Sequence, residues 1–207
     1  MQPDYFANHD KARTFPWTLY HAPLERDLAR FLRDVTGTVL VVGCGLLHEL
    51  DAAPDGIRFV VGDVDRRAVD AVLARRDPRI IDGFVVAPEA PVGRGGFDAI
   101  YAKEVVEHVL AWPTWLASLR RALVPGGRLW LSTPNYGEPW LPAIESTVLE
   151  LIARRSGFTR RGIHPTRFSR TSLARGLRAA AFDDVEVHAT PTRLALAAWA
   201  RSPQPAH

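Results

Sequence analysis

The chain has 207 residues and 47% of them are hydrophobic, which is the size and composition of one α/β domain with a sizeable core. A formal net charge of +3 gives no reason to expect a nucleic-acid or membrane partner through bulk charge. The single cysteine, Cys44, excludes an intrachain disulfide and suits a reducing cytosol. No signal peptide is recognisable, and no apolar run approaches the ~20 residues that span a bilayer, so we expect a cytoplasmic protein.

The first predicted elements are a helix and two strands. Residues 1–17 are aromatic and irregular, and then Leu24, Leu28 and Phe31 recur at helical spacing, which predicts an amphipathic helix over 22–34. Short β-branched runs at 38–42 and 57–61 predict the first two strands, and each of these runs ends at a glycine.

The middle of the chain alternates helices with apolar strands. A helix is expected over 66–75 and another over 113–123, and the Pro125-Gly126-Gly127 tripeptide predicts a turn after the second of them. The strands of this part are expected at 79–86, 97–102 and 128–132. Apolar strands that alternate with helices are typical of a parallel sheet covered on both faces.

After Asn135 the alternation lapses. A helix over about 142–155 and a basic, aromatic loop make 136–168 an insertion, and a helix over 170–181 then resumes the pattern. Runs at 185–188 and 194–199 predict a closing β-hairpin. We therefore expect one domain, with an N-terminal helical cap (1–35), a core (36–135), the insertion, and a C-terminal helix and hairpin (169–200).

A glycine pair follows the first strand. Gly43 and Gly45 let the backbone approach a ligand closely at the carboxyl end of a parallel strand. Asp63 ends the second strand, where a carboxylate can accept hydrogen bonds from both hydroxyls of a ribose. Asp65 directly precedes the next predicted helix, so we expect Asp65 to be its N-cap. A nicotinamide dehydrogenase would also carry such glycines, but Gly45 does not continue into the full dinucleotide fingerprint.

A carboxylate-rich corner follows the fourth strand. Glu104 and Glu107, or Glu104 and His108, share one face of a helical turn at the edge of the sheet where ligands bind. The corner is followed by the helix, the glycine turn, a strand and the tripeptide Thr133-Pro134-Asn135.

The order and spacing of these elements over 97–135 resemble the carboxyl half of the class I S-adenosylmethionine-dependent methyltransferase domain. The branch that is most similar holds the ubiquinone-biosynthesis O-methyltransferases. The resemblance implies a Rossmann-like α/β fold: a seven-stranded, mostly parallel sheet with an antiparallel C-terminal hairpin and helices on both faces. It also implies methyl transfer from S-adenosyl-L-methionine to an oxygen, or less readily a nitrogen, of a small metabolite in specialised biosynthesis.

The resemblance assigns cofactor-binding residues along the chain, and two positions depart from the family. Val41 stands where the family usually has an acid, and Leu47 stands where it usually has a third glycine. Glu49 is a candidate to compensate for the missing acid. The residues expected at the cofactor are Gly43, Cys44, Gly45, Asp63, Val64, Lys103, Tyr20 and Arg26.

In the ubiquinone-type enzymes, and in small-RNA 2′-O-methyltransferases, such a corner and a later histidine are associated with a divalent ion. His164, within the segment 162–168, resembles that later histidine. Glu104, Glu107, His108 and His164 could thus hold Mg²⁺, Mn²⁺ or Zn²⁺. If no metal binds, His108 or His164 is the best candidate for a general base, because histidine titrates near neutrality.

Aromatic residues in 15–21 and in the insertion suit a planar, aromatic or acidic small-molecule substrate, or they simply pack the extra helices on the core. Three alternatives stay open. The departures Val41 and Leu47 allow a protein that no longer methylates and acts as a binding or partner subunit. The arginine-rich segment 154–178 allows an RNA 2′-O-methyltransferase, and the amphipathic segment 141–170 allows peripheral membrane contact. Sequence does not indicate the oligomeric state.

Overall fold

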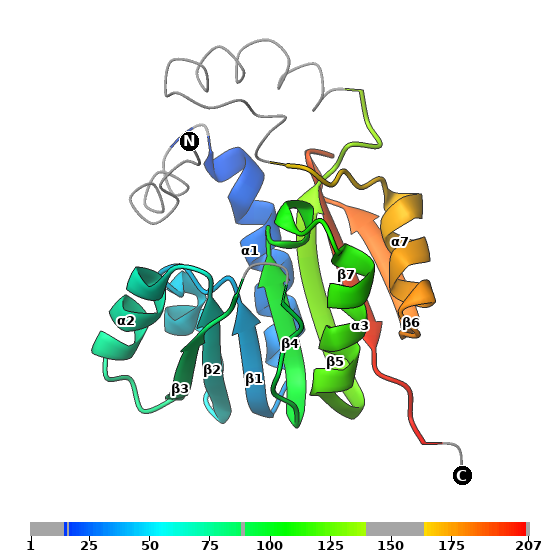
Figure 1. The fold of residues 1–207 in the computed structure, drawn as a ribbon. Helices are drawn as coiled ribbons and strands as arrows, with labels where there is room; N and C mark the ends of the chain where they lie inside the picture. The colour runs from blue at the N-terminus through cyan, green and yellow to red at the C-terminus, as the bar shows by residue number, and fades with distance from the viewer. Residues whose placement is uncertain (1–14, 16, 88–89, 140–163, 206–207) are drawn as a thin grey trace.

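The computed structural model describes residues 15, 17–87, 90–139 and 164–205. The strands of its single sheet are β1 (Gly37–Val42), β2 (Ile57–Asp63), β3 (Ile80–Val85), β4 (Phe97–Lys103), β5 (Leu123–Pro134), β6 (Asp183–Ala189) and β7 (Ala195–Arg201). The sheet has seven strands in the order β3-β2-β1-β4-β5-β7-β6 (Figure 1). Strands β1 to β5 pair in parallel, whereas β7 is antiparallel to β5 and β6, which confirms the predicted fold and hairpin.

Helices lie on both faces of the sheet, and each face has its own apolar core. The helices are α1 (Thr18–Arg33), α2 (Arg66–Ala74), α3 (Trp112–Ala122) and α7 (Arg170–Ala179), with 3-10 turns η2 (His48–Ala52) and η3 (Val106–His108). Figure 1 shows α3 and α7 in front of the sheet and α1 behind it. Side chains alternate along β1, so Leu40 joins the α3 and α7 core while Val39 and Val41 join the α1 and α2 core.

Helix α1 begins four residues before the predicted start at residue 22. The Trp17 carbonyl accepts hydrogen bonds from the Tyr20 and His21 amides, both at 3.0 Å, and these bonds close the first turn. Pro23 lies inside the helix, although its position favoured a helix that starts beside it. Because α1 starts earlier than predicted, Tyr20 lies within this helix.

The tripeptide Pro125-Gly126-Gly127 belongs to β5, so the prediction of a separate turn was wrong. The segment that follows β7 holds it in the ladder: the Gly126 amide donates to the Ser202 carbonyl at 3.1 Å, and the Ser202 amide donates to the Gly127 carbonyl at 2.8 Å. Gly126 has a positive φ of 74°, and the register of β4 with β5 shifts nearby, so the sequence signal marked an irregular stretch of strand.

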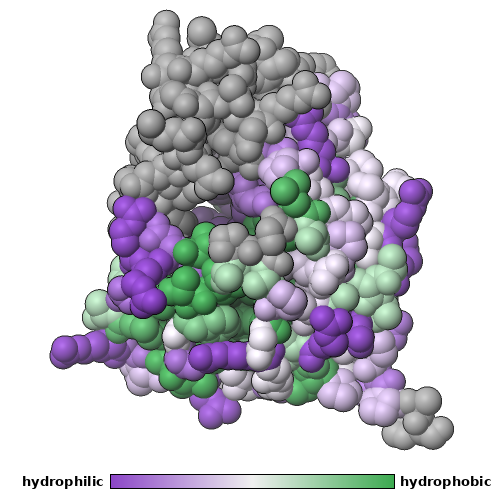
Figure 2. Space-filling view, in the orientation of Figure 1, coloured by the Kyte–Doolittle hydropathy of each residue, from purple (hydrophilic) through white to green (hydrophobic). Residues whose placement is uncertain are grey.

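Strand β3 is the edge of the sheet and is only partly buried, contrary to the expectation of strands buried on both faces. Ile81 is 49% exposed and Val85 is 39% exposed. Hydrophobic side chains are visible over this side of the sheet in Figure 2. The described residues that connect β3 to β4, 86–87 and 90–96, contain no helix, so the predicted alternation is incomplete here.

The predicted helix over 142–155 and most of the insertion lie outside the described residues. None of the helices in the described part of the chain has the length and hydropathy needed to cross a bilayer.

Candidate active site

The loop after β1 opens at the point where the strand order reverses. The chain runs from β1 outward through β2 to β3 and then returns to β4 on the other side of β1. Open α/β sheets bind ligands at such a point, at the carboxyl ends of the strands. Gly43 and Gly45 both have positive φ, at 74° and 49°. A Cβ on Gly43 would lie 2.6 Å from the Val105 side chain, so only glycine lets this loop meet the segment after β4.

Asp63 ties the glycine loop to the next helix. One of its carboxylate oxygens accepts from the Gly45 amide and the other accepts from the Asp65 amide, both at 2.9 Å. Asp65 caps α2 by accepting from the Arg67 amide at 2.9 Å, which confirms its predicted role. Asp63 therefore holds a half-buried carboxylate at the end of β2, where the ribose acceptor was predicted; ribose binding itself stays a prediction.

Leu47 adopts a left-handed backbone conformation, which glycine accepts without strain. Its φ and ψ are 50° and 51°, in the left-handed region, and its side chain is buried against α1. Arg75 supports the turn by donating to the Leu47 carbonyl at 3.0 Å. The path of the loop therefore does not depend on a third glycine. Val41 is buried in the same core as Leu47, so this position brings no charge to the loop.

The other residues predicted at the cofactor differ in exposure. Val64 is 61% exposed directly after β2, and Arg26 is exposed on α1. Cys44 is buried, and burial together with the Asp63 carboxylate raises the pKa of its thiol far above its ordinary value, so the thiol is not a nucleophile. Lys103 ends β4 and forms an ion pair with Glu49.

Glu104 lies at the corner but faces α1. Its φ is +58°, which turns the chain sharply after β4. One carboxylate oxygen accepts from the Tyr20 hydroxyl at 2.5 Å and the other accepts from the Ser132 hydroxyl at 2.8 Å. Burial, followed by the Glu104 charge, raises the pKa of Tyr20 well above its ordinary value, so the phenol stays protonated and donates. Glu104 is thus not among the described residues whose ligand atoms cluster at the predicted metal site.

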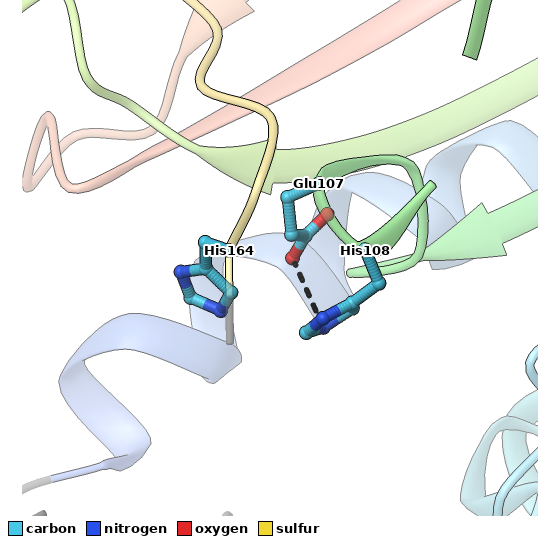
Figure 3. A group of neighbouring side chains, drawn as sticks. All are labelled: Glu107, His108 and His164. Atoms are coloured by element: carbon cyan, nitrogen blue, oxygen red, sulfur yellow. Dashed lines mark ion pairs between the residues drawn. The ribbon is translucent and has the colours of Figure 1, made fainter. Parts of the chain in front are cut away.

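Glu107, His108 and His164 form a cluster in which one ligand atom of each residue lies within 4.8 Å of the others (Figure 3). The Glu107 carboxylate and the His108 Nε2 are 4.0 Å apart, and the rings of His108 and His164 meet edge to face with centroids at 5.0 Å. Three of the four predicted metal-binding residues therefore converge from two distant segments of the chain.

Glu107 is a fully buried carboxyl, and among the described residues neither of its oxygens has a hydrogen bond of good geometry. The buried Thr133 hydroxyl is near enough to act against the effect of burial on the pKa of Glu107. Burial, and after it the negative charge of Glu104, raises the pKa of Glu107 well above its ordinary value. Such a group is costly to bury unless a ligand, a cation or a proton neutralises it. Its orientation toward two imidazoles makes it the strongest sign of a functional centre.

Backbone contacts explain how His164 reaches the corner. The Thr166 amide donates to the Glu107 carbonyl at 3.1 Å, and the Thr166 hydroxyl donates to the Val109 carbonyl at 3.0 Å. The Phe168 side chain is buried in the core beneath α3 and α7, and its carbonyl accepts from the Tyr136 amide at 2.8 Å. These contacts fix the segment 164–168 against η3.

Tyr136, the first residue of the predicted insertion, is a further residue of the site. Its hydroxyl lies 2.6 Å from the His164 Nδ1, and the Arg167 guanidinium sits 4.8 Å from the centre of its ring. The hydrogen bond occupies one ring nitrogen of His164 and leaves the orientation of the imidazole fixed. Its position directly after Thr133-Pro134-Asn135 was the only signal in the sequence.

Solved structures with the same fold have diverse activities. A chain from the complex between the Haloferax volcanii methyltransferase activator Trm112 and a protein named as the putative methyltransferase superposes with a TM-score of 0.75 at 17% identity, over 99% of this chain and 100% of that one. Haemonchus contortus phosphoethanolamine N-methyltransferase 2, in complex with S-adenosyl-L-methionine, gives 0.66 at 15% identity over 91% and 53%. The cyclase SpnF gives 0.65 at 18% identity over 91% and 83%. At these identities the similarity establishes the fold alone.

Sequence comparisons establish the family. A protein of Mycolicibacterium smegmatis, named as a probable S-adenosylmethionine-dependent methyltransferase, is 34% identical over 98 residues; the match spans 47% of this chain and 38% of that protein. Residues 17–187 match a family described as a methyltransferase domain, and this range includes the glycine loop, the corner and His164. The chain therefore belongs to this family of methyltransferase domains.

Proposed function

We propose that this chain is an S-adenosylmethionine-dependent methyltransferase that methylates an oxygen atom of a small molecule. The observation that carries the proposal is the buried Glu107 carboxyl, which faces His108 and His164 beside the glycine loop. A centre that combines a carboxyl with two imidazoles suits the removal of a proton from a hydroxyl group.

The residues at the carboxyl edge fit the cofactor of this family. Asp63 presents a carboxylate for the ribose hydroxyls, and the positive-φ glycines of the loop allow close approach of a ligand to the backbone. The exposed Val64 side chain, directly after Asp63, offers an apolar surface for the adenine ring. The cofactor supplies an electrophilic methyl group on a sulfonium sulfur. The acceptor oxygen attacks the methyl carbon in line with the carbon–sulfur bond, and the sulfur leaves as a neutral thioether.

The protein then has to place the acceptor and take its proton. A histidine of the cluster, His164 or His108, accepts the proton as the hydroxyl oxygen bonds to the methyl carbon. The Tyr136 hydroxyl fixes the His164 ring, and Thr166 fixes the segment that carries it. Positioning of this kind is the main contribution of the protein to a displacement reaction.

The acceptor we favour is an apolar or aromatic hydroxyl compound. Phe15, Leu19 and Leu110 are exposed large hydrophobic side chains near the start of α1 and directly after the corner. Leu19 precedes Tyr20, which contacts Glu104, so this apolar surface adjoins the site. A panel of phenols, catechols and hydroxybenzoates is the first choice for activity measurements.

Replacement of His164 tests the proposal. We expect His164→Ala and His164→Asn to lower turnover about a hundredfold or more, because the acceptor proton loses its base, and to leave the affinity for S-adenosylhomocysteine intact. Asparagine preserves a polar partner for Tyr136 but cannot take the proton. Turnover of His164→Asn equal to that of the unchanged protein would remove His164 from the catalytic role.

A divalent cation at the same cluster is the second form of the proposal. Glu107, His108 and His164 would supply one oxygen and two nitrogen ligands, a set that suits Zn²⁺ or Mn²⁺ better than Mg²⁺. A bound cation would neutralise the buried Glu107 carboxylate and acidify a bound hydroxyl. Metal analysis after chelation and re-addition of each ion tests this form of the proposal. Stoichiometric metal binding that is lost in Glu107→Gln would support the cation, and full activity after chelation would exclude it.

A binding or partner subunit without methyltransferase activity is the second candidate function. The apolar Val41 favours it, because the position lacks the acid that the family usually has. Failure of the protein to bind S-adenosylmethionine would support this candidate against the enzyme.

A further inference from the structure

A half-buried ion pair joins the loop region after β1 to the carboxyl end of β4, and the strand order reverses between these two strands. Glu49 belongs to η2, which continues the loop after β1, and Lys103 is the last residue of β4. The Lys103 ammonium donates directly to the Glu49 carboxylate, and their side chains are only 21% and 12% exposed. An ion pair at this depth is weak evidence for a stabilising role, because desolvation of the two charges offsets much of their attraction.

The pair lies on the same face of the sheet as Val41, the position at which the family usually has an acid. Val41 and Tyr101 are register partners and their side chains share one core, and Lys103, two residues after Tyr101, projects from the same face. Glu49 reaches that face from η2 and is the acid there that pairs with Lys103. Burial would raise the pKa of Glu49, but the Lys103 charge outweighs it and the pKa lies below its usual value.

A buried phenol, that of Tyr101, lies on the same face of β4 as Lys103. The Tyr101 hydroxyl is fully buried and has no hydrogen-bond partner among the described residues. Tyr101 precedes Lys103 by two residues on β4, so the two side chains lie on the same face of the sheet. Burial, and after it the Glu49 charge, raises the pKa of Tyr101, so the phenol stays protonated. A polar site with an opposed anion, cation and spare hydroxyl is suited to a ligand that carries both charges.

We infer that Glu49 and Lys103 bind the amino-acid end of the cofactor, Glu49 the α-ammonium and Lys103 the α-carboxylate. This inference rests on the proposed function, since it assigns a subsite for S-adenosylmethionine. The ion pair is the state without ligand, in which each group satisfies the other. Entry of the zwitterion between them replaces one ion pair with two charge-assisted contacts at the same buried depth.

The test compares two ligands that differ in this end alone. S-adenosylhomocysteine has the amino-acid group, whereas methylthioadenosine keeps the adenosine and sulfur but lacks it. We expect Glu49→Gln and Lys103→Met each to lower the affinity for S-adenosylhomocysteine at least about tenfold, as measured by calorimetry. The affinity for methylthioadenosine should stay unchanged. The double variant Glu49→Gln/Lys103→Met leaves no unpaired buried charge, so it retains the fold and shows the same selective loss.

The exposed ion pair between Asp82 and Arg94 on the β3 side supplies matched controls. Asp82→Asn and Arg94→Gln should change neither affinity. Equal losses for both ligands in the double variant, or unchanged binding of S-adenosylhomocysteine, would overturn the inference and show a structural ion pair. If the unchanged protein bound neither ligand, the proposed function itself would fail, and the inference with it.

Discussion

Asp27 is a half-buried carboxylate on α1 whose partners come from three strands. It accepts from the indole nitrogens of Trp130 and Trp199, both at 2.9 Å, and lies 3.2 Å from the His188 Nε2. Burial alone would raise the pKa of Asp27, but the hydrogen bonds from His188, Trp199 and Trp130 outweigh it and lower the pKa to about 2. Asp27 thus anchors α1, the helix that contains Tyr20, to the sheet.

The lowered pKa makes a prediction for stability against pH. Because the folded pKa lies below the ordinary value of about 3.9, Asp27 stabilises the fold above about pH 4 and loses this contribution as pH falls toward 2. We expect Asp27→Asn to lower the free energy of unfolding by about 2 kcal/mol at neutral pH, measured by urea denaturation. The difference should shrink between about pH 4 and pH 2; a difference independent of pH would contradict the assignment.

Leu47 gives a second prediction at the scale of one residue. Its left-handed backbone costs about 1–2 kcal/mol, which glycine would relieve, whereas loss of a buried leucine side chain costs about 3–5 kcal/mol. Leu47→Gly should therefore destabilise the protein by about 1–4 kcal/mol in urea denaturation and leave the affinity for S-adenosylhomocysteine unchanged. The control Leu50→Ala, a buried residue of η2, has no such strain to relieve and should cost more. A clear change in affinity for Leu47→Gly would show that the side chain shapes the cofactor loop.

Helices α3 and α7 pack through a glycine. A Cβ on Gly176 would lie 2.6 Å from the Trp112 ring, which is itself held edge to face against Phe168. Glycine-to-alanine changes in helices usually stabilise by about 1 kcal/mol, but this one should destabilise by about 1–3 kcal/mol because of the clash. Thermal unfolding of Gly176→Ala measures it. The double variant Gly176→Ala/Trp112→Leu relieves the clash and should lose less than the two single changes added together.

Sequence predicted the elements whose signals are local. The strand at Phe97–Lys103, the α2 cap at Asp65 and the hairpin of β6 and β7 all follow from apolar periodicity, capping and turn residues. Strand β5 was mispredicted at its start because Gly126 and Gly127 signal a turn, whereas their hydrogen bonds to Ser202 come from the far end of the chain. The exposed edge position of β3 is likewise a property of the sheet and not of its sequence.

The site shows the same division between local and distant determinants. Gly43, Gly45 and Asp63 lie where their spacing predicted, because they end adjacent parallel strands. The partner of Glu104 could not be predicted, because Tyr20 is 84 residues away and reaches it only through the packing of α1. The Asp27 network was missed for the same reason, as its partners lie 103, 161 and 172 residues along the chain.

For the whole molecule, the fold alone does not identify the function, because proteins with this fold have more than one activity. The function has to be argued from the residues of the site. The chain belongs to a family of methyltransferase domains, and its glycine loop with Asp63 and its cluster of Glu107, His108 and His164 follow strands at the carboxyl edge of one sheet. Under the proposed function, the first would bind the cofactor and the second would take the proton of the acceptor hydroxyl.

Calorimetric titration of the purified protein with S-adenosylmethionine and S-adenosylhomocysteine, before and after chelator treatment, would show whether the chain has a working cofactor site. Both ligands should bind with about micromolar dissociation constants in spite of Val41 and Leu47. Binding of neither ligand, with or without chelator, would contradict the enzyme and favour the binding or partner subunit.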